Sequence, residues 1–164
     1  MQFIAWRLSR QEWSFADAPV TTDDRFFVPE VLNVLGDKES FADIGAHHGQ
    51  VTMRFLDTVT GQFEKVWMVE PDTFNIRRLN EAVSASKDSE RNKIHILAST
   101  VSDRVQSRKF HSGLGYASQL SDLGQDTVET TTVDQLGLSP SFMKLHLEGA
   151  ELEVLKGAEK TMKA

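Results

Sequence analysis

One stretch of the sequence, residues 41–51 (F-A-D-I-G-A-H-H-G-Q-V), constrains the fold more than any other. A short apolar run that contains Asp43 leads into a loop with Gly45 and Gly49, and a segment with helical patterning follows. This order predicts a strand, a tight turn and a helix, the opening unit of an α/β nucleotide-binding domain. Glycine lets the backbone approach a ligand closely, and free N–H groups at the start of a helix favour anionic or polar ligand groups.

The spacing of the glycines distinguishes two kinds of nucleotide. The dinucleotide fingerprint G-x-G-x-x-G would need glycines at positions 45, 47 and 50, but His47 and Gln50 occupy the last two. A bulky side chain at position 47 would lie where a pyrophosphate needs bare backbone, which weakens an NAD(P)-dependent oxidoreductase as an interpretation. The pattern that is present, D-x-G-x-x-x-G, is the looser form found in Rossmann-like enzymes that bind S-adenosylmethionine (SAM).

The composition narrows the class of protein further. A length of 164 residues with 40% hydrophobic residues indicates one globular domain. The net charge of −6 argues against nucleic acid as the main partner. The chain has no cysteine, no apolar run near the roughly 20 residues of a membrane span, and no signal-peptide core in Met1–Arg10. We therefore expect a cytoplasmic protein without a membrane partner.

Strand and helix patterns alternate along most of the chain. Lys65–Glu70 and Lys93–Ala98 are short apolar runs typical of strands, and Pro71 and Asp72 open a helical pattern between them. This order predicts an α/β fold of the Rossmann-like class, with a mainly parallel sheet and helices on both faces. The predicted helices cover residues 29–35, 50–58, 73–87 and 150–162, and a fourth strand covers residues 142–147.

Two parts of the chain depart from this alternation. Residues 1–27 carry aromatic side chains without a clear period. We predict that they form an N-terminal segment, which either packs over the main domain, residues 28–164, or contributes to a substrate lid. Residues 99–127 are polar and contain several glycines, and residues 128–133 are mostly β-branched. The latter are expected to pair with residues 109–111 as a small antiparallel insertion.

Glu70 ends the second predicted strand, 25 positions after Gly45. In Rossmann-type sheets an acidic residue at this point accepts hydrogen bonds from the ribose hydroxyls of the nucleotide. A charged residue can also end a strand simply because it lies at the surface. The glycine loop at a suitable distance upstream favours the ribose role.

The fourth predicted strand carries Lys144, His146 and Glu148 at alternating positions, so that all three would lie on one face. Titratable residues on a central parallel strand are costly unless they are paired or line a site. An edge strand with one wet face is the alternative. Sites in this architecture lie at the carboxyl ends of the strands, where Glu148 would be found, which favours a functional role.

Several motifs together resemble one known family. The run F-M-K-L-H-L-E-G-A-E-L-E-V-L-K-G-A-E-K at Phe142–Lys160 is similar to the signature K-I-D-V-E-G-A-E-x-x-V-L-x-G-A of FkbM-family methyltransferases. The other family marks are D-I-G-A-x-x-G at 43–49, E-P at 70–71 and T-x-D-x-L at Thr132–Leu136. The resemblance covers roughly residues 28–162. It implies a class I, SAM-dependent methyltransferase, typically one that acts on hydroxyl oxygens of sugars, polyketides or similar metabolites.

The resemblance also implies roles for individual residues. Asp43 and the loop residues Gly45, Ala46, His47 and Gly49 would hold the methionine end of SAM, Glu70 with Pro71 would hold the ribose, and Ser99 or Asp103 would flank the adenine. An alcohol must lose its proton as it attacks the methyl group, so His146 is a candidate base, and Glu148 would orient it or the acceptor. The alternative is a structural His146 bonded to Lys144 or to the backbone.

The sequence departs from the family at two points. His146 stands where the family usually has Asp, and His47 where it often has Asn. The chain also ends where further strands normally follow, so we expect an N-terminal fragment whose unpaired fourth strand would favour self-association.

Three further expectations concern ligands and rival functions. The histidines at 47, 48 and 146 could gather with Glu148, but nothing in their spacing requires zinc or iron, and no metal is predicted. The expected partner is a small-molecule or glycan acceptor. A non-catalytic or truncated nucleotide-binding module is the alternative outside enzymes.

Overall fold

The computed structural model describes residues 26–60, 62–113 and 118–164. The chain divides into two compact units, residues 1–34 and 35–164. The described part of the first unit contains α2 (Pro29–Leu32), which is shorter than the predicted helix. Almost all of the predicted N-terminal segment, residues 1–27, lies outside the described residues.

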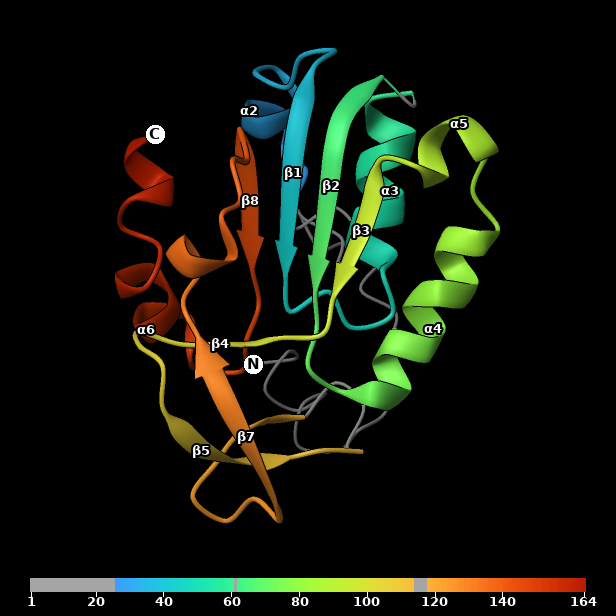
Figure 1. Cartoon of the computed structure of the whole chain (residues 1–164). Helices are drawn as coiled ribbons and strands as arrows, with labels where there is room; N and C mark the ends of the chain where they lie inside the picture. The colour runs from blue at the N-terminus through green and yellow to red at the C-terminus, as the bar shows by residue number, and fades with distance from the viewer. Residues whose placement is uncertain (1–25, 61, 114–117) are drawn as a thin grey trace, which may run out of the picture. The chain divides into compact units, whose positions relative to one another are not determined.

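A four-stranded parallel sheet forms the centre of the second unit (Figure 1). Its spatial order is β3-β2-β1-β8, and every neighbouring pair is parallel, as predicted. The chain therefore builds outward from β1 to β3 and then crosses back to place β8 on the other side of β1. Ligands of open α/β sheets bind at such a reversal, outside the carboxyl ends of the strands. The strands are β1 (Glu39–Ile44), β2 (Phe63–Val69), β3 (Ile94–Leu97) and β8 (Phe142–Leu145).

Helices cover both faces of the sheet, which confirms the predicted fold class. On one face, the ring of Phe41 from β1 lies 4.6 Å from that of Phe55 in α3, measured between centroids. On the other face, Ile44 and Val69 belong to a buried cluster that includes Val154 of α6. Both faces of the central strands are thus dry, which explains their nearly continuous apolar sequences. The helices are α3 (Gln50–Thr58), α4 (Thr73–Ser84), α5 (Asp88–Arg91) and α6 (Glu151–Lys156).

A second, smaller sheet lies beyond the carboxyl ends of the parallel strands (Figure 1). Its order is β4-β7-β5-β6, and β5 pairs with β7 antiparallel with Lys109 opposite Thr127. The predicted antiparallel insertion is present, but its register differs from the prediction, because Lys109 and Phe110 pair with Thr127 and Asp126 and not with residues 128–133. The strands are β4 (Thr100–Val101), β5 (Ser107–His111), β6 (Gln119–Leu120) and β7 (Asp126–Thr131), and short 3-10 turns are η2 (Asp134–Leu136) and η3 (Thr161–Lys163).

The last predicted helix, residues 150–162, is interrupted. The α-helix ends at Lys156, because Gly157 packs so closely on Ser102 that a Cβ there would lie 2.2 Å from the Ser102 carbonyl oxygen. The Asp134 carboxylate then accepts hydrogen bonds from the backbone N–H groups of Lys160 and Thr161. These tertiary contacts outweigh the helical pattern of the sequence.

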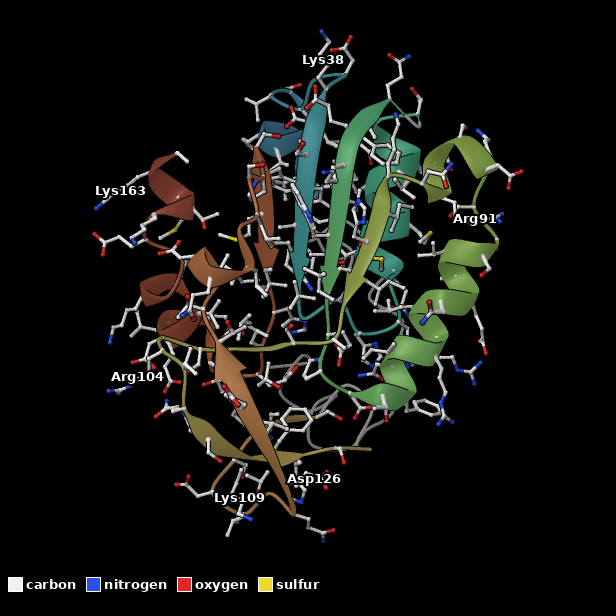
Figure 2. All side chains as sticks on the ribbon, in the orientation of Figure 1. Lys38, Arg91, Arg104, Lys109, Asp126 and Lys163 are labelled. Carbon is white, nitrogen blue, oxygen red and sulfur yellow. The ribbon has the colours of Figure 1, made fainter. Side chains whose placement is uncertain are left out.

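Most charged side chains lie outside the ribbon and reach toward solvent. Figure 2 shows this for the labelled residues Lys38, Arg91, Arg104, Lys109, Asp126 and Lys163. Asp43 and Lys144 are exceptions, because both are buried in the parallel sheet. A buried charge is costly unless it is paired, so these two residues are expected to interact with a partner inside the sheet.

Candidate functional site

A pocket opens at the carboxyl ends of the parallel strands, between them and the small sheet. It contains about 640 Å³ of empty space, part of it open to solvent. The lining comes from the loop after β1, the end of β2, the start of α4, the segments after β3 and β8, and the small sheet. The lining residues from the predicted site are Gly45, His47, Glu70, Pro71, Ser99, His146 and Glu148, and others are Val69, Asn75, Val101, Phe110, Ser118, Leu120 and Leu147.

The glycine loop leaves β1 with Gly45 in the left-handed region, at φ 76°. A Cβ on Gly45 would lie 2.1 Å from the His146 carbonyl oxygen, so only glycine lets the loop cross β8 at this distance. Gly49, at φ 86°, is the N-cap of α3, and a Cβ there would lie 3.0 Å from the Met68 Cε atom. Gly49 and the buried Ala46 are not among the residues that line the pocket. The loop is therefore shaped by packing as well as by ligand access.

Asp43 supports this loop from inside the protein. Its side chain has no exposed surface and accepts hydrogen bonds from Lys144 Nζ and Thr52 Oγ1, both at 2.8 Å. Lys144 Nζ also donates to the Gly45 carbonyl oxygen at 2.7 Å. We predicted that Asp43 holds a cofactor directly, but it does not line the pocket. Its observed contacts join β1, β8 and the loop.

Glu70 lies at the end of β2 and is almost fully buried at the pocket wall. Its Oε2 accepts from the backbone N–H of His47 at 2.9 Å. Its Oε1 accepts from the backbone N–H of Asp72 at 3.0 Å and from the Asn75 side chain at 3.1 Å. Burial raises the pKa of Glu70, although these hydrogen bonds favour its charged form. One carboxylate thus ties the glycine loop to the start of α4.

Asp72 begins α4 and also holds the small sheet. Its Oδ1 caps the helix by accepting from the backbone N–H groups of Phe74 and Asn75, at 2.8 and 3.3 Å. Its Oδ2 accepts from Gly113 N at 2.7 Å and from Ser118 Oγ at 2.8 Å. Burial would raise the pKa of Asp72, but these hydrogen bonds outweigh burial and lower it. The side chain therefore remains an anionic anchor for one wall of the pocket.

The catalytic candidates follow β8, which ends at Leu145 and not at residue 147 as predicted. His146 Nε2 and Glu148 Oε1 are 3.4 Å apart, and about a third of each side chain is exposed. Both residues line the pocket, so the structure brings the predicted pair together at its rim. The pair has the composition of a general base and an orienting carboxylate.

His47 of the glycine loop also lines the pocket. Its ring stacks on that of His48, with centroids 3.7 Å apart. Burial, followed by the effect of His48 and the charge on Lys144, lowers the pKa of His47 from the usual 6.5 to about 4. The imidazole is therefore neutral near pH 7.

Asp103 is not among the residues that line the pocket. The chain turns into β4 directly after Ser99, which lines the pocket, and β4 then pairs with β7. Asp103 pairs instead with its sequence neighbour Arg104, with 3.4 Å between the charged atoms. Of the two residues expected to flank an adenine, the structure therefore brings only Ser99 to the pocket.

Sequence reasoning missed the pocket residues of the small sheet and Asn75 on α4. Phe110 of β5, Leu120 of β6 and Ser118, which directly precedes β6, line the pocket. The glycine-rich break in the pattern indicated an insertion, but no local signal places it over the strand ends. Among the described residues, no group of three or more His, Cys, Asp or Glu side chains could hold a metal ion.

The parallel sheet, the strand reversal beside β1 and the acidic residue at the end of β2 together define a Rossmann-like α/β domain. The family model for the methyltransferase FkbM domain matches residues 43–164, which is more than half of the chain. The chain therefore belongs to the FkbM methyltransferase family.

The structure is also similar to the crystal structure of methyltransferase FkbM from Methylobacillus flagellatus KT, with a TM-score of 0.70 and 21% sequence identity. The match covers 97% of this chain and 39% of that chain, so this sequence spans about two fifths of its structural relative. Comparison with curated proteins gives no match. In the described part of the chain, no helix is long and apolar enough to cross a membrane.

Proposed function

We propose that this chain is the cofactor-binding part of a SAM-dependent methyltransferase that methylates a hydroxyl oxygen of a sugar, polyketide or similar small molecule or glycan. The observation that carries the proposal is the position of Glu70. Its carboxylate lines the pocket at the end of β2 and is tied to the glycine loop through His47 N. Membership of the FkbM methyltransferase family supports the reaction class.

The residues around the pocket fit SAM. Glu70 Oε2 accepts one hydrogen bond in the structure, from His47 N, and a carboxylate oxygen can accept a second from a ribose hydroxyl. Val101 and Leu120 offer apolar surface to an adenine, next to the hydroxyl of Ser99. Glu148 places a carboxylate at the rim, which suits the positive charge of the cofactor. When bound, SAM supplies an electrophilic methyl group.

The chain's own residues would position the reactants and handle the proton of the acceptor. An oriented nucleophile accounts for much of the acceleration of such a transfer. His146 would accept the proton of the attacking hydroxyl at Nδ1, and Glu148, whose Oε1 lies 3.4 Å from Nε2, would orient the ring and stabilise its charged form. The family usually has Asp at this position, so an imidazole base would be a property of this sequence.

An NAD(P)-dependent oxidoreductase is less well supported. The His47 side chain lines the pocket within the loop that would have to approach a pyrophosphate with bare backbone. A non-catalytic binding module would keep the same pocket and would differ only in the absence of methyl transfer.

Calorimetry with SAM and with NAD tests the proposal, with Glu70→Gln as the informative variant. Glutamine keeps the shape of the side chain and removes its charge and part of its acceptor capacity. We expect SAM binding to weaken roughly ten- to hundredfold, the usual effect of losing hydrogen bonds to a charged group. Glu64→Gln, on the exposed part of β2, is the matched control and should leave affinity unchanged. Binding of NAD but not SAM would overturn the proposal.

A further inference from the structure

The backbone of Glu148 lies in the left-handed region, which is strained for a residue with a long side chain. Its φ is 52°, and Gly149 follows at φ 106°. Ala150 N donates to the Leu147 carbonyl oxygen at 3.3 Å, which closes a turn with both central residues at positive φ. Such turns prefer Asn-Gly, because a long side chain is strained in the left-handed region. A strained residue persists only where its surroundings hold it, and strain of this kind gathers at functional sites.

The Glu151 carboxylate holds this turn from both sides. Its Oε1 accepts from Leu147 N at 2.7 Å, and its Oε2 accepts from Gly149 N at 3.0 Å. The two bonded N–H groups belong to the residues immediately before and after Glu148. With both neighbours bonded to one rigid group, the backbone of Glu148 has little freedom to leave its positive φ.

We propose that Glu151 is a positioning residue that clamps the turn at 147–149 and thereby directs the Glu148 carboxylate toward His146 and the pocket. The role of Glu148 in this inference rests on the proposed function. Glu151 itself does not line the pocket, so it would act only through Glu148. It also gives a physical reason for the spacing of the two acids in E-G-A-E. A carboxylate three positions after Glu148, at the start of α6, can reach back to both flanking N–H groups.

The charge state of Glu151 agrees with this role. Partial burial would raise its pKa, but the hydrogen bonds from Leu147 and Gly149 outweigh burial and lower it. Glu151 therefore stays ionised near neutral pH, and both of its oxygens act as acceptors. A protonated side chain would lose one of the two bonds.

A thermodynamic cycle separates positioning from simple helix capping. SAM affinity is measured by calorimetry for the wild type, Glu151→Ala, Glu148→Gly and the double variant. Glycine at position 148 accepts positive φ without strain and removes the side chain being positioned. We expect each single variant to bind SAM roughly three- to tenfold more weakly, and the double variant to bind no more weakly than Glu148→Gly. Glu159→Ala, an exposed acid after the same helix, is the control and should bind as the wild type does.

Two readouts by nuclear magnetic resonance do not depend on SAM. In Glu151→Ala, amide exchange at Leu147 and Gly149 should accelerate roughly ten- to hundredfold while Met68 in β2 stays protected. The His146 ring signals should shift as they do in Glu148→Gly. If Glu151→Ala destabilises the whole domain, Glu151→Gln provides the same comparison with a milder change.

The outcomes can be told apart. Full additivity in the double variant would overturn the inference, as would unchanged amide exchange and unchanged His146 signals in Glu151→Ala. If the wild type fails to bind SAM, but Glu151→Ala shows the expected changes in amide exchange and in the His146 signals, the proposed function is overturned and the positioning role of Glu151 is supported.

Discussion

Lys144 places a positive charge inside the parallel sheet, with 3% of its side chain exposed. Asp43 lies 2.8 Å from its ammonium nitrogen, and the Gly45 carbonyl oxygen accepts a further hydrogen bond from it. Buried pairs of this kind seldom add much net stability, but removing one partner leaves the other charge buried without compensation. The pair therefore links the glycine loop to β8 through a buried side chain.

Replacing this lysine tests that dependence. We expect Lys144→Met to lower the free energy of unfolding by about 3–5 kcal/mol, because Asp43 would remain buried without its cation. Urea unfolding followed by circular dichroism measures the change. The control is Lys163→Met, which breaks an exposed pair with Glu159 and should cost about 0.5 kcal/mol or less. Similar losses of unfolding free energy in both variants would show that the buried pair contributes no more to stability than an exposed one.

At the scale of elements, the crossing of the glycine loop over the end of β8 determines the geometry of the pocket. Gly45 lies so close to His146 that no side chain fits between them. The same crossing brings the predicted cofactor loop and the predicted catalytic pair to one pocket. The relative placement of these two motifs therefore depends on one close backbone approach.

A pair of glycine substitutions isolates the effect of this approach. Gly45→Ala should lower the free energy of unfolding by about 3 kcal/mol or more, because the new methyl group would both strain the backbone and displace β8. Gly137 also has positive φ, at 64°, but no atom lies within 4 Å of its missing Cβ. Gly137→Ala should therefore cost only about 1–2 kcal/mol of backbone strain. Thermal unfolding compares the two, and equal costs would contradict the steric argument.

At the scale of the whole molecule, the groups around the pocket make stability depend on pH. Burial keeps His47 neutral down to a pKa of about 4, against 6.5 for an exposed imidazole. Between these values the unfolded chain binds a proton that the folded chain does not, so the free energy of unfolding falls as the pH falls. Glu70 acts in the opposite direction, because its pKa is raised and its contribution decreases as the pH rises above the usual 4.5. Asp72 and Glu151 have lowered pKa values and lose their contributions only at more acidic pH.

The His47 contribution can be isolated by substitution. In His47→Asn, stability should fall less than in the wild type as the pH is lowered from about 6.5 to about 4. The other three groups titrate in both proteins, so the difference between the two stability curves reports on residue 47. Urea unfolding at several pH values provides the curves. Parallel curves across this window would show that His47 titrates alike in the folded and unfolded chains.

Much of the molecule follows from patterns that are local in the sequence. The helix at Gln50–Thr58 has the bounds that were predicted, and the parallel strands lie where short apolar runs indicated them. An antiparallel insertion was also predicted, although its observed register differs from the predicted one. Apolar periodicity and glycine spacing are effective signals here because both faces of the sheet are covered. A strand that is buried on both faces has a nearly continuous apolar sequence, which can be recognised locally.

The tertiary structure alone decided what surrounds the pocket and how its residues are held. Asp43 and Lys144 are 101 positions apart, and no local pattern could show that Asp43 bonds Lys144 inside the sheet. The wall contributed by Phe110 and Ser118 depends on where the small sheet lies, and the helix after Ala150 stops early because Gly157 meets Ser102. The sequence by itself determined which elements form and which motifs they carry, since those depend on neighbouring residues. Contacts between distant segments determined which of those residues face the pocket and which support it from behind.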